Sequence, residues 1–107
     1  MDVVDQIKRI MKDHPIVLFM KGTPEFPMCG FSSRAVQALE AAGAAFFAVN
    51  VLEEPQIRAS LPQYSNWPTF PQLFIQGELI GGCDIIEDLH KAGELKRMAA
   101  DVSEQDS

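Results

Sequence analysis

The chain has 107 residues, 47% of them hydrophobic and 22% charged, and a formal net charge of −6. This length predicts one domain, and this composition supports both a core and an aqueous surface. The acidic balance argues against binding to nucleic acid or to an anionic membrane, because both need concentrated positive charge. No apolar run reaches the ~18–20 residues that span a bilayer, and the N-terminus lacks the pattern of a secretion signal. We therefore expect a soluble protein of a reducing compartment.

The first third of the chain predicts a helix, a buried strand and a loop. Apolar residues recur at steps of three and four over residues 2–14, with Asp2 at the N-cap and Pro15 as the stop. Residues 16–20 are apolar without alternation, which is typical of a strand covered on both faces. Two prolines within residues 21–28 argue against regular structure in that loop.

A second helix, a second strand and a third helix follow. Residues 33–42 carry small and apolar side chains at helical spacing, and Gly43 suits a left-handed C-cap. Residues 46–51 form a largely apolar strand. Pro55 suits the first turn of a helix over residues 54–61, and a loop follows that helix.

The last third of the chain predicts a β-hairpin and two helical segments. Strands over residues 71–76 and 79–80 flank a Gly-Glu turn. A fourth helix covers residues 84–92, a helical extension covers residues 94–100, and residues 101–107 form a polar tail. The side chains of the fourth helix that we expect to be buried are Ile85, Ile86 and Leu89.

The order of these elements predicts the fold class. An early strand–helix–strand unit implies a parallel pair with a right-handed crossover, and the closing hairpin adds antiparallel strands. We therefore expect an α/β protein with a four-stranded mixed sheet flanked by helices, which is the thioredoxin-like arrangement. Residues 1–100 are assigned to this single domain.

Cys29 is the first candidate functional residue, because it stands just before a helix. Unpaired N–H groups and the helix dipole favour its thiolate, which is the form that attacks disulfides and binds metals. Gly30 leaves the sulfur accessible, and Lys21 at the other end of the loop can return its ammonium toward it. A small buried hydrophobe is the alternative role for this cysteine.

Ser32 and Cys83 limit the redox chemistry of that thiol. Ser32 stands where a Cys-x-x-Cys motif would place its second cysteine, so the motif cannot close a disulfide. Its hydroxyl can instead hydrogen-bond Cys29 or cap the helix. Cys83 is either a second thiol that takes part in the chemistry or an inert packed side chain. The spacing of cysteines and histidines argues against an all-protein zinc site.

Four sequence blocks together resemble the monothiol glutaredoxins of the Cys-Gly-Phe-Ser class, in their short single-domain form. The blocks are Lys21-Gly22-Thr23-Pro24, Cys29-Gly30-Phe31-Ser32, Trp67-Pro68-Thr69-Phe70-Pro71 and Gly81-Gly82-Cys83-Asp84. The resemblance covers about residues 2–98. It implies the thioredoxin-like fold, a cis peptide bond before Pro71, and a bacterial cytoplasm or an organelle matrix after removal of a transit peptide.

The resemblance also implies a site for glutathione. The residues that would hold this tripeptide are Lys21 and Arg58 at its glycine carboxylate, Phe70 at its cysteine backbone, and Cys83 and Asp84 at its γ-glutamyl end. The charges agree, since two cations suit one carboxylate, a helix N-terminus suits the other, and an aspartate suits the amine. Alternatively, Lys21 and Arg58 are ordinary solvated charges on the surface, and Asp84 is an ordinary helix N-cap.

Two functions follow from the resemblance. In the first, Cys29 and the thiol of a bound glutathione ligate a 2Fe–2S cluster that a homodimer completes and delivers to apo iron–sulfur proteins; a BolA-like protein also pairs with this class. In the second, Cys29 is the monothiol nucleophile of a glutathione-dependent oxidoreductase. The first function is favoured, because this class is weak in the oxidoreductase reaction. We attribute that weakness to the loop over residues 23–28. A binding domain with an inert thiol is the third interpretation.

Overall fold

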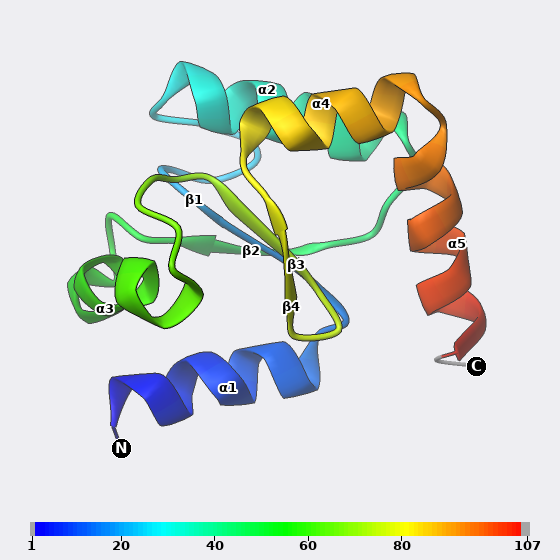
Figure 1. Ribbon diagram of the computed structural model, residues 1–107. Helices are drawn as coiled ribbons and strands as arrows, with labels where there is room; N and C mark the ends of the chain where they lie inside the picture. The colour runs from blue at the N-terminus through cyan, green and yellow to red at the C-terminus, as the bar shows by residue number, and fades with distance from the viewer. Residues whose placement is uncertain (1, 106–107) are drawn as a thin grey trace.

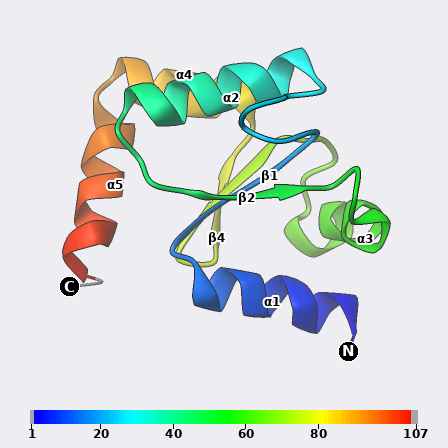
Figure 2. The ribbon, with the colours of Figure 1, turned by 180° about the vertical axis from the view of Figure 1, so that it is seen from behind.

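Helices cover both faces of a central sheet in the computed structural model, which describes residues 2–105. One face is covered by α2, α4 and α5, and the other by α1 and α3 (Figure 1). The same layers are visible from behind (Figure 2). None of the helices in this described part combines the length and apolar character that a membrane span requires. The helices are α1 (Val3–Asp13), α2 (Gly30–Ala41), α3 (Pro55–Ser65), α4 (Cys83–Lys91) and α5 (Glu94–Gln105), and the strands are β1 (Ile16–Met20), β2 (Phe47–Asn50), β3 (Gln72–Ile75) and β4 (Glu78–Gly81).

The sheet has the strand order β2-β1-β3-β4. β1 pairs in parallel with β2 and antiparallel with β3, and β3 pairs antiparallel with β4. Leu18, in the middle of β1, pairs with Ala48 on one side and Leu73 on the other. The hairpin between β3 and β4 turns at Gln76 and Gly77, whose φ angles of 52° and 79° suit a type I′ turn. The expected α/β, thioredoxin-like fold with a four-stranded mixed sheet is confirmed.

The two faces of β1 belong to two separate hydrophobic clusters. Ile16, Leu18 and Met20 pack with residues of α2, α4 and α5. Val17 and Phe19 point the other way and pack with α1 and α3. All five side chains are at most 4% exposed. This double burial explains why the sequence of the strand shows no polar alternation.

The bounds of α2 and α3 differ from those expected. α2 begins at Gly30, earlier than expected, and Cys29 is therefore its N-cap. α3 continues through Pro62 to Ser65, whereas it was expected to end at residue 61. Pro62 lies in the last turn, where the helix can lose one backbone hydrogen bond. Asn66 then closes the helix in a left-handed conformation, with φ 56°, and its N–H donates to the Pro62 carbonyl.

Burial and helix length also differ from the expectation at three places. Ile85 is 36% exposed rather than buried, because it faces the pocket described below; Ile86 is buried and Leu89 partly so. Phe47 is partly exposed because β2 is an edge strand. α5 continues to Gln105, beyond the expected end, and its Val102 packs in the core next to α2 and α4. Residues 106–107 of the expected tail lie outside the described residues.

Candidate functional site

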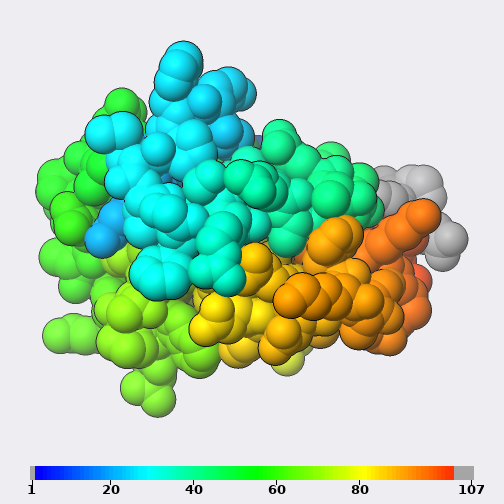
Figure 3. Space-filling model, turned by 90° about the horizontal axis from the view of Figure 1, so that it is seen from above, coloured from blue at the N-terminus to red at the C-terminus, as the bar shows by residue number. Residues whose placement is uncertain are grey.

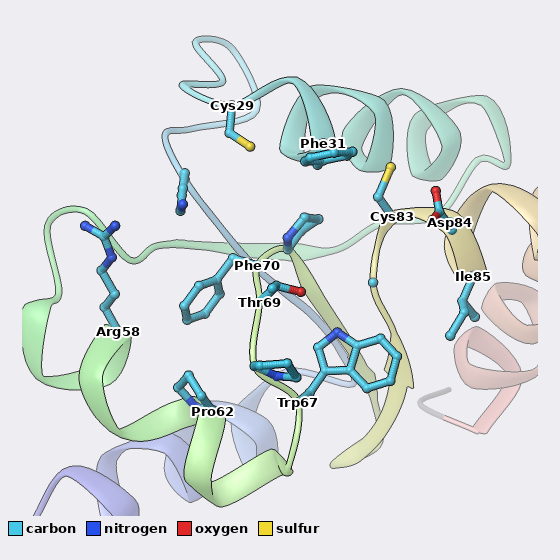
Figure 4. Close-up of a pocket in the computed structure, with 14 residues that line it drawn as sticks. Cys29, Phe31, Arg58, Pro62, Trp67, Thr69, Phe70, Cys83, Asp84 and Ile85 are labelled. Atoms are coloured by element: carbon cyan, nitrogen blue, oxygen red, sulfur yellow. The ribbon is translucent and has the colours of Figure 1, made fainter.

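Cys29 stands between the buried strand β1 and the helix α2. β1 ends at Met20, a loop over residues 21–28 follows, and Cys29 enters α2 in an extended conformation with φ −153° and ψ 136°. Its carbonyl accepts the first bond of the helix from Ser33 N–H (2.9 Å). The cysteine is partly exposed, and its sulfur points into the space enclosed by the pocket residues (Figure 4). A Cβ on Gly30 would lie in open space, which agrees with free access to the sulfur from that side.

The surroundings of Cys29 lower the pKa of its thiol below the ordinary cysteine value. The largest cause is a hydrogen bond from the Ser32 backbone N–H, which favours the thiolate; partial burial opposes it. The Phe31 N–H and the positive charge of Lys21 lower the pKa further. The thiolate expected from the helix N-terminus and from Lys21 is thus supported by the geometry.

The Ser32 side chain has a further partner that the sequence did not suggest. It is fully buried, and its hydroxyl oxygen accepts a hydrogen bond from the Lys21 backbone N–H (3.1 Å). It also contributes a weaker hydrogen bond to Cys29 that lowers the pKa of this thiol. The serine that replaces a second cysteine therefore ties the start of α2 to the end of β1.

The loop over residues 21–28 forms no helix or strand, but it is ordered by its own backbone. Met28 N–H donates to the Lys21 carbonyl (2.9 Å), and Thr23 and Phe26 exchange backbone hydrogen bonds of 3.2 and 3.1 Å. The expected lack of regular structure is confirmed, but hydrogen bonds between residues of the loop hold it in one conformation. Phe26 is 77% exposed at its tip. The loop, in light blue, projects from the surface beside α2 (Figure 3).

A pocket of about 870 Å³ lies beside Cys29. This volume is in the range of small-molecule sites, which span about 300–1,000 Å³. The pocket brings Cys29 together with the five residues predicted to bind a tripeptide, which are Lys21, Arg58, Phe70, Cys83 and Asp84. The peptide bond between Phe70 and Pro71 is cis, as the resemblance implied. The sequence-based selection of residues therefore converges on one place, although their binding roles stay predictions.

The charged residues of the pocket are separated along its length. Arg58 of α3 lies at one end and Asp84 of α4 at the other, with Phe70 and Thr69 between them (Figure 4). Neither Arg58 nor Lys21 is paired with a carboxylate in the described part of the chain. The pocket thus offers unpaired positive charge on one side, and a carboxylate at a helix N-terminus on the other.

Several pocket residues were not assigned to the site from the sequence. They include Phe31, Pro62, Trp67, Thr69 and Ile85. Trp67 and Thr69 belong to one of the four motif blocks, so the sequence could have placed them at the site. Ile85 gave none, because an apolar side chain on a helix predicts burial. The indole Nε1 of Trp67 is buried and has no hydrogen-bond partner among the described residues.

Cys83 differs from Cys29 in its surroundings. It is the first residue of α4, is 6% exposed, and its Sγ lies 3.7 Å from Glu87 Oε1. Glu87 is held in turn by an ion pair with Arg34 of α2. Burial raises the pKa of the Cys83 thiol, and the carboxylates of Glu87 and Asp84 raise it further, whereas Arg34 opposes them. Ligand atoms of Cys83, Asp84 and Glu87 lie within 4.8 Å of one another, but Glu87 is already engaged by Arg34.

The fold and the site define a thioredoxin-like protein with one thiol activated at a helix N-terminus. The sequence profile of the family Glutaredoxin matches residues 16–80, and the chain belongs to this family. It is 52% identical over 103 residues to "Glutaredoxin 4" of Pasteurella multocida, an alignment that covers 96% of this chain and 94% of the relative. With Ser32 in place of a second cysteine, the chain is a monothiol glutaredoxin, as the sequence blocks indicated.

Solved structures of glutaredoxins have the same fold. The solution structure of reduced poplar apo GrxS14 is 46% identical in sequence, with a TM-score of 0.80 over 94% of this chain and 93% of that one. A crystal structure of the buckwheat glutaredoxin–glutathione complex is 28% identical, with a TM-score of 0.81 over 94% of this chain and 89% of that one. Both structures thus support the thioredoxin-like fold over 94% of the chain.

Proposed function

We propose that this protein binds a 2Fe–2S cluster with the help of glutathione and transfers it to apo-proteins during iron–sulfur protein maturation. The observation that carries the proposal is the contrast between the two cysteines. Only Cys29 combines partial exposure with a lowered pKa, while Cys83 is buried and its pKa is raised. One chain therefore offers one protein thiolate, and a cluster needs further thiolates from outside the chain.

Glutathione supplies the second thiolate in this proposal. Its glycine carboxylate binds the unpaired cations of Lys21 and Arg58, which form no ion pairs in the described structure. The backbone of Phe70 pairs with the cysteine of glutathione, and its γ-glutamyl end lies against Cys83 and Asp84. The complex of the buckwheat glutaredoxin with glutathione supports this assignment, because that protein has the same fold.

A homodimer completes the ligand set. Two copies of Cys29 and two glutathione thiols provide the four thiolates that such clusters need. Half of these ligands are held without a covalent bond to the protein, so the cluster can be released to a recipient. A BolA-like protein is the alternative partner in place of the second chain. The bacterial origin of relatives such as that from Pasteurella multocida supports a cytoplasmic location.

Glutathione-dependent thiol–disulfide exchange is the second candidate, and the lowered pKa of Cys29 favours it. The Cys29 thiolate would attack the glutathionyl sulfur of a protein mixed disulfide, so that a Cys29–glutathione disulfide forms and the protein thiolate leaves. A second glutathione thiolate would then attack this disulfide, releasing glutathione disulfide and restoring Cys29. If the loop over residues 23–28 suppresses this reaction, shortening it raises turnover on a glutathionylated substrate; unchanged turnover rejects that explanation.

Anaerobic purification in the presence of glutathione tests the carrier proposal. We expect a visible absorption band and a dimer, both of which are lost in Cys29→Ser. The matched control is Cys83→Ser, which removes the other thiol and should retain both properties. Protein that stays colourless after reconstitution with iron, sulfide and glutathione would reject the proposal. Loss of colour in Cys83→Ser would make Cys83 a ligand and exclude the shared-dimer arrangement.

A further inference from the structure

The side chain of Asn50 connects the end of β2 to the loop that precedes Cys29. Its Oδ1 accepts hydrogen bonds from the backbone N–H of Gly22 (2.9 Å) and of Leu52 (3.0 Å). Asn50 pairs with Met20 in the sheet register, so the contact lies just beyond the point where β1 and β2 separate. A single carbonyl oxygen thus fixes both a turn of its own segment and a residue 28 positions away.

Gly22 is the point at which this contact acts on the loop. It is buried and has φ +91°. A Cβ at this position would lie 2.5 Å from the Phe26 carbonyl oxygen and 2.6 Å from the Met28 nitrogen, so the loop folds back tightly over it. A buried backbone N–H needs a hydrogen-bond partner, and Asn50 Oδ1 fills this role.

The backbone hydrogen bonds of Lys21, the residue before Gly22, connect the loop to the residues that flank Cys29. The Lys21 carbonyl accepts from Met28 N–H, and the Lys21 N–H donates to Ser32 Oγ. Met28 and Ser32 lie on either side of Cys29 in the sequence, so these two hydrogen bonds hold the chain before and after the sulfur. Displacement of Gly22 therefore shifts the residues that surround the sulfur.

We propose that Asn50 is a positioning residue for Cys29, acting through the loop over residues 21–28. Both of its hydrogen bonds use Oδ1 as an acceptor, so the carbonyl oxygen is the group that matters. Asn50 is not among the residues that line the pocket, and its effect on Cys29 is indirect. It keeps the loop in the conformation that places the Ser32 N–H and the Lys21 charge next to the thiolate.

The test compares Asn50→Ala with Asn50→Asp in metal-free Cys83→Ser protein, in which one thiol reacts. The readouts are the rate of Cys29 alkylation by iodoacetamide at pH 7 and the hydrogen exchange of the Gly22 amide. Asn50→Ala should slow alkylation at pH 7 at least about twofold and speed exchange at Gly22 about tenfold. Asn50→Asp retains the acceptor and should behave as the parent protein at 1 M salt, where the Debye length is about 3 Å.

Two further variants keep the test decisive. Leu52→Ala is the matched control. It removes an exposed side chain from the same turn but keeps the backbone N–H that bonds Asn50, so it should change neither readout. Asn50→Ser has a side chain too short for Gly22 but long enough for the local turn at Leu52, and replaces Asn50→Ala if that variant does not fold. Unchanged readouts in a folded Asn50→Ala or Asn50→Ser variant would overturn the proposal. So would an Asn50→Asp variant that alkylates and exchanges like Asn50→Ala at 1 M salt. Because no metal is used, the result does not depend on the cluster function.

Discussion

Cys29 and Cys83 occupy comparable places in the fold, at the starts of the neighbouring helices α2 and α4, and both line the same pocket. Their thiols nevertheless differ in the direction of the pKa shift. The pKa of Cys29 is lowered chiefly by the Ser32 N–H, and that of Cys83 is raised chiefly by burial. A helix N-terminus is therefore insufficient to activate a thiol. The donors and charges within contact of the sulfur decide the outcome.

The neighbouring charges reinforce this difference. Lys21 adds positive charge near Cys29, whereas Cys83 faces the carboxylates of Glu87 and Asp84. Arg34 reduces the effect on Cys83 but is itself bound to Glu87. The surroundings of Cys29 thus favour its thiolate, whereas those of Cys83 favour its protonated thiol.

The largest expected effect is the difference in reactivity between the two thiols. At pH 7, iodoacetamide should modify Cys29 at least about tenfold faster than Cys83, because thiolate content and accessibility both favour Cys29. Peptide mass spectrometry over time measures both rates in one sample. Cys29→Ser and Cys83→Ser provide the single-thiol controls. Equal rates would show that the two surroundings do not control reactivity as described.

A smaller change is expected on removing the carboxylate beside Cys83. Glu87→Gln should lower the pKa of Cys83 toward its ordinary value and speed its alkylation about threefold, since a negative neighbour disfavours the thiolate. The control is Asp88→Asn on the exposed side of α4. Thermal stability should change little, because the lost ion pair with Arg34 is exposed. Slower alkylation of Cys83 in Glu87→Gln would contradict the assigned role of Glu87.

The smallest effect concerns the pH dependence of unfolding. The raised pKa of Cys83 stabilises the fold below the ordinary cysteine value of 9.0, and this contribution is lost as pH rises through the folded-state pKa. The lowered pKa of Cys29 has the opposite sign: its contribution is present above the same value and is lost as pH falls through the folded-state pKa.

Urea unfolding from pH 7 to pH 10.5 measures these slopes. Each thiol contributes less than about 1.4 kcal/mol per pH unit, the limit for one proton. Relative to the wild type, Cys83→Ala should gain stability as pH rises above 9, and Cys29→Ala should lose stability as pH rises toward 9. Substitution shifts the absolute stability, so the change with pH is the quantity to compare. Two slopes of the same sign would refute the opposition between the thiols.

The sequence predicted the parts of the fold that depend on local pattern. The uninterrupted apolar run of β1 indicated burial on both faces, and two hydrophobic clusters confirm it. The residues selected as a binding site lie around one pocket; the motif blocks contain all of them except Arg58, which the family resemblance alone suggested. The cis bond before Pro71, also implied by the resemblance, is confirmed. Spacing and periodicity alone would not have predicted that bond, since most peptide bonds before proline are trans.

Features that depend on the three-dimensional arrangement were not predicted. Ile85 has an apolar side chain on a helix, and only the position of the pocket explains its exposure. The contact between Asn50 and Gly22 joins segments 28 residues apart, so no local pattern reveals it. The early start of α2 was missed because the Cys-Gly-Phe sequence lacks the usual capping side chains.

The position of Trp67 has a practical consequence for measuring this protein. It is the single tryptophan of the chain and it lines the pocket, with its indole Nε1 buried and without a hydrogen-bond partner among residues 2–105. Its fluorescence therefore arises from one place, where an entering ligand changes the polarity around the ring. The protein contains its own optical probe, and titration of tripeptides and their analogues needs no attached dye. A bound chromophore that absorbs in the near ultraviolet would quench the same emission by energy transfer.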